Sequence, residues 1–369
     1  METRPYVPWN MMNSFMIDVF KAYGVPDADA RICADVLLES DRRGIESHGC
    51  NRFKPIYIDR IVQGTLLPET HIEILKETPT TVVIDAHDGM GMVASHRIME
   101  MLIEKAKKFG MAGGAICNST HYGIAGYWTT MASNAGLIGI TGTNARPSTA
   151  PTFGVENMMG TNPLTFSFPT DEEFPFCLDC ATSIVQRGKI EYYARVGKDT
   201  PAGMVVANDG TTLTDSFEIL KALVNGTAAL APLGGIGDEL CGYKGYGYAA
   251  AVEILSAALT GGPFMKALSG VNEDGEPQMY HLGHFFFVIN PEFFMGLETF
   301  KKTAGAICRA LRASQKAPGQ EHIYTAGEKE WLVWCERKDK GVPVSEAVQK
   351  ELIKLRDNLD LPYKFPFEI

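Results

Sequence analysis

The sequence lacks long apolar runs, basic runs and a secretion signal. A membrane-crossing helix needs about 20 consecutive apolar residues, and the longest apolar segment, FFFVIN at 285–290, has only the length of a strand. The N-terminal stretch METRPYVPWNMMNSF has no basic segment followed by an apolar core. The formal net charge is −10, whereas nucleic-acid binding needs clustered Lys and Arg. We therefore expect no membrane association and no nucleic-acid partner.

The chain also lacks a cysteine pattern typical of disulfides or zinc. Its eight cysteines are scattered, and 369 residues can build a core without disulfides. We therefore expect a reduced, cytoplasmic protein. Cys177 and Cys180 form a lone CxxC within an expected strand, where residues three apart point to opposite faces. His281 and His284 enter another strand with the same divergence, so no metal site is predicted.

Standard nucleotide-binding motifs are missing as well. No P-loop is present, and no GxGxxG lies in a βαβ unit with an acidic residue about 20 positions on. The glycine-rich segment 232–253, PLGGIGDELCGYKGYGYAAAVE, leads into an expected helix and carries Lys244 between two glycines. Such a loop can hold a phosphate, with the lysine as a point charge.

What is present is the composition of a globular α/β protein, 45% hydrophobic and 21% charged. Apolar residues at helical spacing predict a helix over 11–23 and another starting near Asp27, which can cap it. A β-branched run predicts a strand at 80–86. Ser95 is expected to cap an amphipathic helix that stops at Gly110.

From about residue 112, short apolar strands alternate with glycine-rich turns, and the last 75 residues are again mainly helical. Helical ends around an α/β middle predict that the two ends pack together as one domain, with a ligand cleft between it and the middle. Ser345 is expected to cap the final helix. The remaining expected elements are strands at 113–117, 137–144, 164–169, 176–181 and 284–291 and a helix at 242–262.

Two stretches carry unusual polar residues. In DRRGIESHGCNRF (41–53), Arg42, Arg43, His48 and Arg52 lie close together in a loop, where an arginine fork and a histidine can bind a carboxylate. The alternative is an ordinary solvated loop. In NSTHYGIAGYW (118–128), a histidine precedes a glycine turn at an expected strand end, where α/β proteins gather ligands.

His121 in that second stretch can act as a proton donor and acceptor near neutral pH, or it can be a structural turn residue. Three further turns lie at strand ends: GTNARPSTAP (142–151), GTNPLTF (160–166) and LDCATS (178–183). The amides of Asn144 and Asn162 can stabilise these turns or bind ligand hydroxyls.

Taken in order, seven motifs resemble the type-2 malate/L-lactate dehydrogenase family, which also includes ureidoglycolate and sulfolactate dehydrogenases and a cyclic imine reductase. The resemblance extends from about residue 10 to 310. It implies an NAD(P)-dependent oxidoreductase, usually a homodimer, with an α/β fold unlike the Rossmann domain. The motifs are RGIESHGCNR, NSTHYGIAGYW, GTNP, LDCATS, GK at 188–189, PLGG and KGYGYAAAVE.

The resemblance also implies roles for the residues in these motifs. His121 would be the catalytic acid/base, with Asp179 orienting it, while Arg52 and His48 would bind the C1 carboxylate of a 2-hydroxy acid. The cofactor, NAD or alternatively NADP, would be lined by the stretches 121–126, 142–144 and 179–183 and by Lys244. The predicted cofactor residues are Gly123, Ile124, Thr143, Asn144, Ala181, Thr182, Ser183 and Lys244.

Arg146 departs from the family pattern, which has a smaller or uncharged residue there. We expect it to bind a second carboxylate and favour malate over lactate, unless it is only a surface arginine. The expected activity is malate/oxaloacetate interconversion. The alternatives are reduction of a cyclic imine acid, another 2-hydroxy acid substrate, or a non-catalytic binding protein. The expected domains are 1–115 with 296–369, for substrate and dimerisation, and 116–295, for the cofactor.

Overall fold

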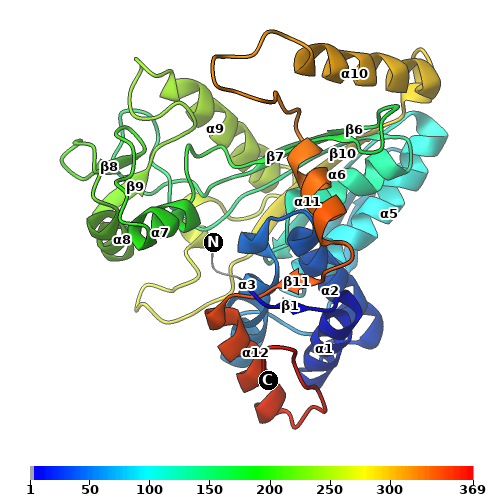
Figure 1. Cartoon of the computed structure of the whole chain (residues 1–369). Helices are drawn as coiled ribbons and strands as arrows, with labels where there is room; N and C mark the ends of the chain where they lie inside the picture. Colours follow the sequence, from blue (N-terminus) through cyan, green and yellow to red (C-terminus); the bar gives the residue numbers. More distant parts are fainter. Residues whose placement is uncertain (1–3, 369) are drawn as a thin grey trace.

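The computed structural model describes residues 4–368 and has a seven-stranded sheet at its centre (Figure 1). Its strands are β2 (Glu73–Glu77), β3 (Thr81–Asp85), β4 (Met111–Ser119), β5 (Ile138–Thr143), β6 (Leu164–Phe168), β7 (Phe176–Cys180) and β10 (Leu282–Ile289). Their order is β2-β3-β4-β10-β5-β6-β7. The pair β3–β4 is parallel and the other neighbouring pairs are antiparallel.

Strand β10 lies between β4 and β5, which connects distant parts of the chain. His284 on β10 pairs with Ile116 on β4 and with Thr143 on β5. Phe286 and Val288 lie in the main core, as alternation along a strand dictates. The strands expected from the sequence are confirmed, and the expected turns follow the ends of β4, β5 and β7.

Helices cover both sides of this sheet. Helices α5 and α6 lie side by side and contact β4, β5 and β6, whereas α9 contacts β10 from the other side (Figure 1). The helices are α1 (Trp9–Ala22), α2 (Asp27–Arg42), α3 (Cys50–Arg52), α4 (Asp59–Gln63), α5 (Gly91–Phe109), α6 (Ala125–Asn134), α7 (Arg187–Arg195), α8 (Ser216–Asn225), α9 (Gly242–Ala258), α10 (Leu297–Arg312), α11 (Glu328–Arg337) and α12 (Glu346–Asn358).

The two ends of the chain lie together. Strand β1 (Tyr6–Val7) pairs with β11 (Val342–Pro343), and the Phe15 ring contacts the ring of Phe365. A smaller core forms where α7 and α8 pack beside the two-stranded sheet of β8 (Val205–Ala207) and β9 (Ala228–Leu230). The expected boundary at 115/116 falls inside β4, and the central sheet takes strands from both expected domains. The division of the chain into a substrate domain and a cofactor domain stays a prediction.

The expected start of α2 near Asp27 is confirmed, but the two capping residues expected for α2 and α5 are wrong. Helix α5 starts at Gly91 rather than at Ser95, which is buried inside the helix. Asp27 is the first residue of α2 and forms ion pairs with Lys21 and Arg31 instead of capping the helix. The expected cap at Ser345 is confirmed, because its hydroxyl accepts a hydrogen bond from the Val348 N–H.

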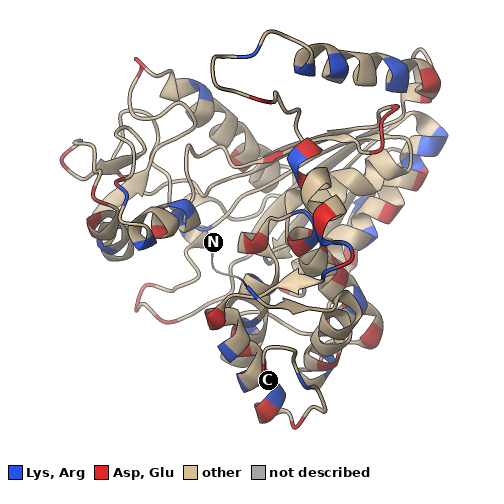
Figure 2. Cartoon of the chain, viewed as in Figure 1, with Lys and Arg blue, Asp and Glu red and all other residues tan. Residues whose placement is uncertain are grey.

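Charged residues of both signs are interspersed along the helices (Figure 2). Within residues 4–368, no helix has both the length and the apolar character needed to cross a bilayer. In the same part of the chain, no three His, Cys, Asp or Glu side chains come together in a way that could hold a metal ion.

Candidate active site

His121 lies between the end of β4 and the start of α6, at the turn predicted from the sequence. Gly123 forms this turn with a φ of 81°, and a Cβ there would lie 2.4 Å from Cγ1 of Val36. Only glycine fits such a position, because the left-handed conformation and the close helix both exclude a side chain. The imidazole of His121 is therefore held at a fixed point beside α2.

Two groups meet Nδ1 of His121. The hydroxyl oxygen of Tyr57 lies 2.6 Å away, and the N–H of Gly123 donates to Nδ1 at 3.3 Å. Because a backbone N–H can only donate, Nδ1 is an acceptor here, and the proton of the neutral ring is on Nε2. A hydroxyl both donates and accepts hydrogen bonds, so Tyr57 can also accept a hydrogen bond from Nδ1–H of the protonated ring. Nε2 is thereby left for a substrate.

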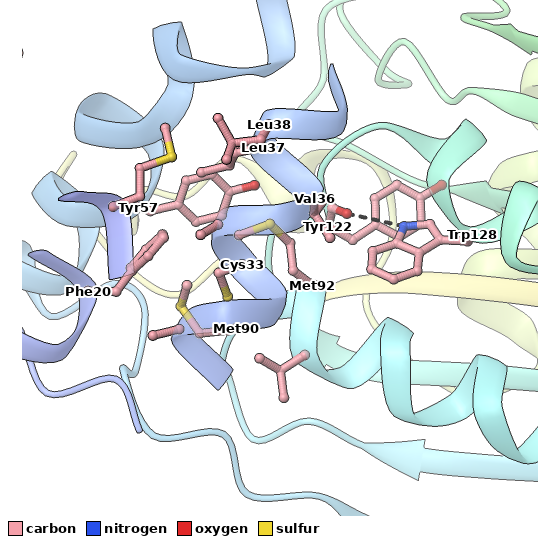
Figure 3. Close-up of a cluster of buried hydrophobic side chains, with 14 of the residues drawn as sticks. Phe20, Cys33, Val36, Leu37, Leu38, Tyr57, Met90, Met92, Tyr122 and Trp128 are labelled. Atoms are coloured by element: carbon pink, nitrogen blue, oxygen red, sulfur yellow. Dashed lines mark hydrogen bonds between the residues drawn. The ribbon is translucent and has the colours of Figure 1, made fainter. Parts of the chain in front are cut away.

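Tyr57 comes from the main hydrophobic core. It sits in a π-helical segment, Phe53–Ile58, a type of helix turn often found at functional sites. Its ring is fully buried among Phe20 and the side chains of α2, as Figure 3 shows. Burial raises the pKa of its phenol, so the hydroxyl keeps its proton across the physiological range.

His48 stacks beside His121, with ring centroids 5.8 Å apart and planes 23° apart. Burial, and then the charge of Arg52, lower the pKa of His48 to about 4. Burial also places the pKa of His121 well below its usual range, with the neighbouring His48, Arg60 and Arg52 adding to the effect. Both rings are therefore neutral at pH 7 in the free protein, and a bound anion beside the arginines would raise both pKa values.

A buried carboxylate holds the loop that carries His48 and Arg52. Asp41 at the end of α2 accepts a hydrogen bond from the Cys50 N–H at 2.9 Å, and Gly49 packs directly against it. From α11, Arg337 donates to the carbonyl of Asp41 and to Glu46. The loop is thus fixed from two helices that lie far apart in the sequence.

The basic residues of 41–53, which were predicted to lie together, have different partners in the structure. Arg42, the last residue of α2, and Arg43, which follows it, form ion pairs with Glu39, so they support the fold. Arg52 donates through Nε to the Ser47 carbonyl and has no carboxylate partner within the described residues. Arg60, which sequence reasoning missed, is half-buried on α4 and is near enough to His121 to affect its pKa.

The structure does not bring Asp179 to His121, so the prediction that Asp179 orients the histidine is wrong. Its carboxylate accepts hydrogen bonds from the Gly126 N–H at 2.7 Å and from Thr165 at 3.1 Å, which fixes the start of α6 to β6 and β7. Asp179 lines a cavity of about 550 Å³ between α2, α6 and α11, which Trp331 also lines.

Of the other predicted ligand residues, some use their polar groups within the fold and others keep a polar group free. Thr182 and Ser183 use their hydroxyls on backbone carbonyls, and Thr143 contacts the buried His284. Asn144 accepts a hydrogen bond from the Gly283 N–H, yet its buried amide nitrogen Nδ2 has no partner in the part of the chain that the structure describes. Lys244 is exposed in the first turn of α9, without an ion pair among the described residues.

The remaining predicted positions are backbone sites. Ile124 directly precedes α6, and Ala181 follows the end of β7. The two histidines of HLGH diverge as expected: His281 faces Asp88, whereas His284 lies between Thr143 and Ser119.

The comparisons with known proteins agree with the resemblance seen in the sequence. A family model described as malate/L-lactate dehydrogenase matches residues 7–353. Malate dehydrogenase from Pyrococcus horikoshii is 42% identical over 94% of this chain and 93% of its own length. L-sulfolactate dehydrogenase from Methanocaldococcus jannaschii is 38% identical over 94% and 95%. The crystal structure of malate dehydrogenase from Entamoeba histolytica superposes with a TM-score of 0.94 at 40% identity, covering 98% of this chain and all of that one. The chain belongs to the malate/L-lactate dehydrogenase family.

Proposed function

We propose that this chain is an NAD(P)-dependent oxidoreductase that interconverts a small 2-hydroxy acid and its 2-oxo acid, with malate and oxaloacetate as the preferred pair. One observation carries the proposal. The imidazole of His121 is held through Nδ1 by Tyr57, while Arg52 and Arg60, which have no carboxylate partner within the described residues, lie beside it. The relatives named malate dehydrogenase support the same substrate pair.

In the proposed mechanism, Arg52 binds the C1 carboxylate and His48 donates a hydrogen bond to it. His121 accepts the hydroxyl proton at Nε2 during oxidation and returns it to the forming alkoxide during reduction. Nε2 can accept this proton only in the tautomer that carries its ring proton on Nδ1, which then donates a hydrogen bond to Tyr57 Oη. The free ring, with its proton on Nε2, reaches this tautomer by proton exchange with water before the hydroxyl proton is transferred. Because the arginines hold the substrate in place, this proton transfer needs no large movement of the protein.

NAD is the proposed cofactor, with NADP as the alternative, and it would supply hydride acceptance and donation at its nicotinamide ring. Two features fit such a group. Among residues 4–368, the buried amide nitrogen of Asn144 has no hydrogen-bond partner, and Lys244 at the start of α9 has no carboxylate partner. These residues would hold the cofactor, together with the backbone of Gly123 and Ile124 before α6.

Oxidation of NADH and NADPH by purified protein tests the proposal, with oxaloacetate, pyruvate, 2-oxoglutarate, sulfopyruvate and a cyclic imine acid as substrates. We expect the highest kcat/KM with oxaloacetate, and a loss of about 100-fold or more in His121→Asn. Higher turnover of the cyclic imine would instead favour the reductase. Nucleotide binding without turnover of any of these acids would favour a non-catalytic protein.

We also propose a cytoplasmic homodimer. The short segment before α10 exposes three consecutive large apolar side chains, Phe293 by 56%, Phe294 by 68% and Met295 by 82%, and contiguous exposed apolar side chains are typical of a surface that another chain covers. Light scattering after size-exclusion chromatography measures the mass directly. A particle of 40.4 kDa, the mass of one chain, would contradict the dimer.

A further inference from the structure

Most arginines of this chain form ion pairs with carboxylates. Three of the remaining arginines lie close together. Within residues 4–368, the arginines without an ion pair are Arg195, which is exposed on α7, and Arg52, Arg60 and Arg146. The last three are close enough to act on one another electrostatically: burial lowers the pKa of Arg60 most, and the charges of Arg146 and Arg52 lower it further. Three unpaired like charges at one site favour an anion there.

Arg60 is directed toward the site by its helical position. It follows Tyr57 by three residues, and residues three apart lie on the same face of a helix. Tyr57 reaches His121 from this face. The Arg60 charge acts on both of them, lowering the pKa of His121 and opposing the burial that raises the pKa of Tyr57.

An aromatic ring supports the Arg60 side chain. The central guanidinium carbon lies 4.1 Å from the centroid of the Tyr280 ring, in the segment before β10. Tyr280 in turn packs on Gly270, where a Cβ would lie only 2.4 Å from the ring. Stacking uses the flat face of a guanidinium and leaves its N–H edge free for a carboxylate or sulfonate.

We propose that Arg60, positioned by Tyr280, binds the second anionic group of the substrate and selects doubly anionic 2-hydroxy acids over those with one carboxylate. This inference rests on the proposed function and names its substrate class. Arg52 then remains for the C1 carboxylate, and Arg146 adds a further charge from the exposed side. Dicarboxylates and sulfocarboxylates share the required chemistry.

The test compares kcat/KM for oxaloacetate, sulfopyruvate and pyruvate in Arg60→Gln. A charge-assisted bidentate contact stabilises its ligand enough that we expect a loss of about 10- to 100-fold for the two dianions. Pyruvate, which lacks the second group, is expected to lose less than about 3-fold. Loss for only one dianion identifies whether the site takes a carboxylate or a sulfonate. An equal loss for all three acids, or no loss, would overturn the proposal.

Two further variants make the result specific. Tyr280→Leu removes the stacking partner and is expected to lower the dianion-to-pyruvate ratio in the same direction. It carries the test alone if Arg60→Gln does not fold. Arg195→Gln removes the same charge from an exposed position and is expected to leave all three values unchanged. A change of the ratio in this control would show a general charge effect and overturn the assignment.

Binding without turnover separates this proposal from the proposed function. If the wild-type protein reduces none of the acids, its thermal stabilisation by succinate is compared with that by propionate. Stronger stabilisation by succinate that disappears in Arg60→Gln supports the anion site, although the enzyme assignment has failed. Equal stabilisation by the two acids in the wild-type protein overturns the anion site.

Discussion

The hydroxyl of Tyr57 lies 2.6 Å from Nδ1 of His121, although 64 positions separate the two residues in the chain. This contact joins the hydrophobic core to the proposed proton-transfer group, because the Tyr57 ring is fully buried. A histidine that must alternate between two protonation states needs a partner that can both donate and accept. A phenol with a raised pKa meets this need without ionising itself.

Tyr57→Phe is expected to lower kcat about 10- to 100-fold with little change in KM, because His121 loses the partner that orients it. The imidazolium would also lose an acceptor, so the apparent pKa on the acidic limb of the kcat–pH profile should move lower still. Steady-state kinetics between pH 5 and 9 measure both effects. Tyr127→Phe is the matched control, since its hydroxyl donates to Asp35 instead. Equal profiles for Tyr57→Phe and the wild-type protein would contradict this role.

Asp41→Asn tests the carboxylate under the His48 loop. Burial raises the pKa of Asp41 to about 7, against an opposing contribution from the Cys50 N–H. Nearby Glu46 raises it further, and Arg337 lowers it. Between pH 4 and 7 the folded protein therefore binds more protons at this site than the unfolded chain does, so stability from this group falls as pH rises through about 7.

Asparagine cannot ionise, so the Asp41→Asn variant should lack this pH dependence. We expect the wild-type protein to lose on the order of 3–4 kcal/mol of unfolding free energy, relative to the variant, between pH 4 and pH 8. Urea unfolding of both proteins at several pH values within that range measures the difference between their unfolding free energies. Because both proteins contain His48 and His121, the titrations of these histidines largely cancel in this difference. Parallel pH curves for the two proteins would show that Asp41 is not the titrating group.

Local patterns predicted most of the architecture. The apolar spacing of 11–23 reports which side of that helix is buried, and the continuous apolar run in 284–291 indicates a buried strand. Both elements formed as expected. Helix α5 shows the limit of such patterns. Ser95 resembles a cap in the sequence, but the helix continues back to Gly91, and the serine is buried within it.

The site was predicted only where glycines mark it. His121 and Arg52 belong to glycine-flanked loops, so their position outside regular elements is visible locally. Tyr57 and Arg60 sit in FKPIYIDR, which has no such mark, and they reach the site through contacts between distant parts of the chain. The π-helical segment that turns Tyr57 toward His121 depends on tertiary packing, which the sequence pattern does not contain.

Arg146→Ala tests the charge that departs from the family pattern. Because Arg146 is exposed, its contribution should be smaller than that of Arg60, about 3- to 10-fold in kcat/KM for oxaloacetate and less for pyruvate. It should also shrink when ionic strength rises to about 1 M, since the screening length then falls to about 3 Å. Kinetics with both acids at low and high salt measure this. A loss for pyruvate equal to that for oxaloacetate would show that Arg146 does not select dicarboxylates.

Asp179→Asn distinguishes a catalytic carboxylate from one that positions a helix. Asp179 accepts its hydrogen bonds from the Gly126 N–H and the Thr165 hydroxyl, and none from His121. The amide oxygen of asparagine can keep the Gly126 contact, and Thr165 can accept from the amide nitrogen. We therefore expect less than about a 10-fold loss in kcat, whereas removal of a true general acid or base typically costs 100-fold or more. The loss should appear with oxaloacetate and pyruvate alike, because α6 supports the turn that holds His121 for every substrate. A loss of the size found in His121→Asn would restore Asp179 to the proton-transfer step and require a rearranged site in the bound state.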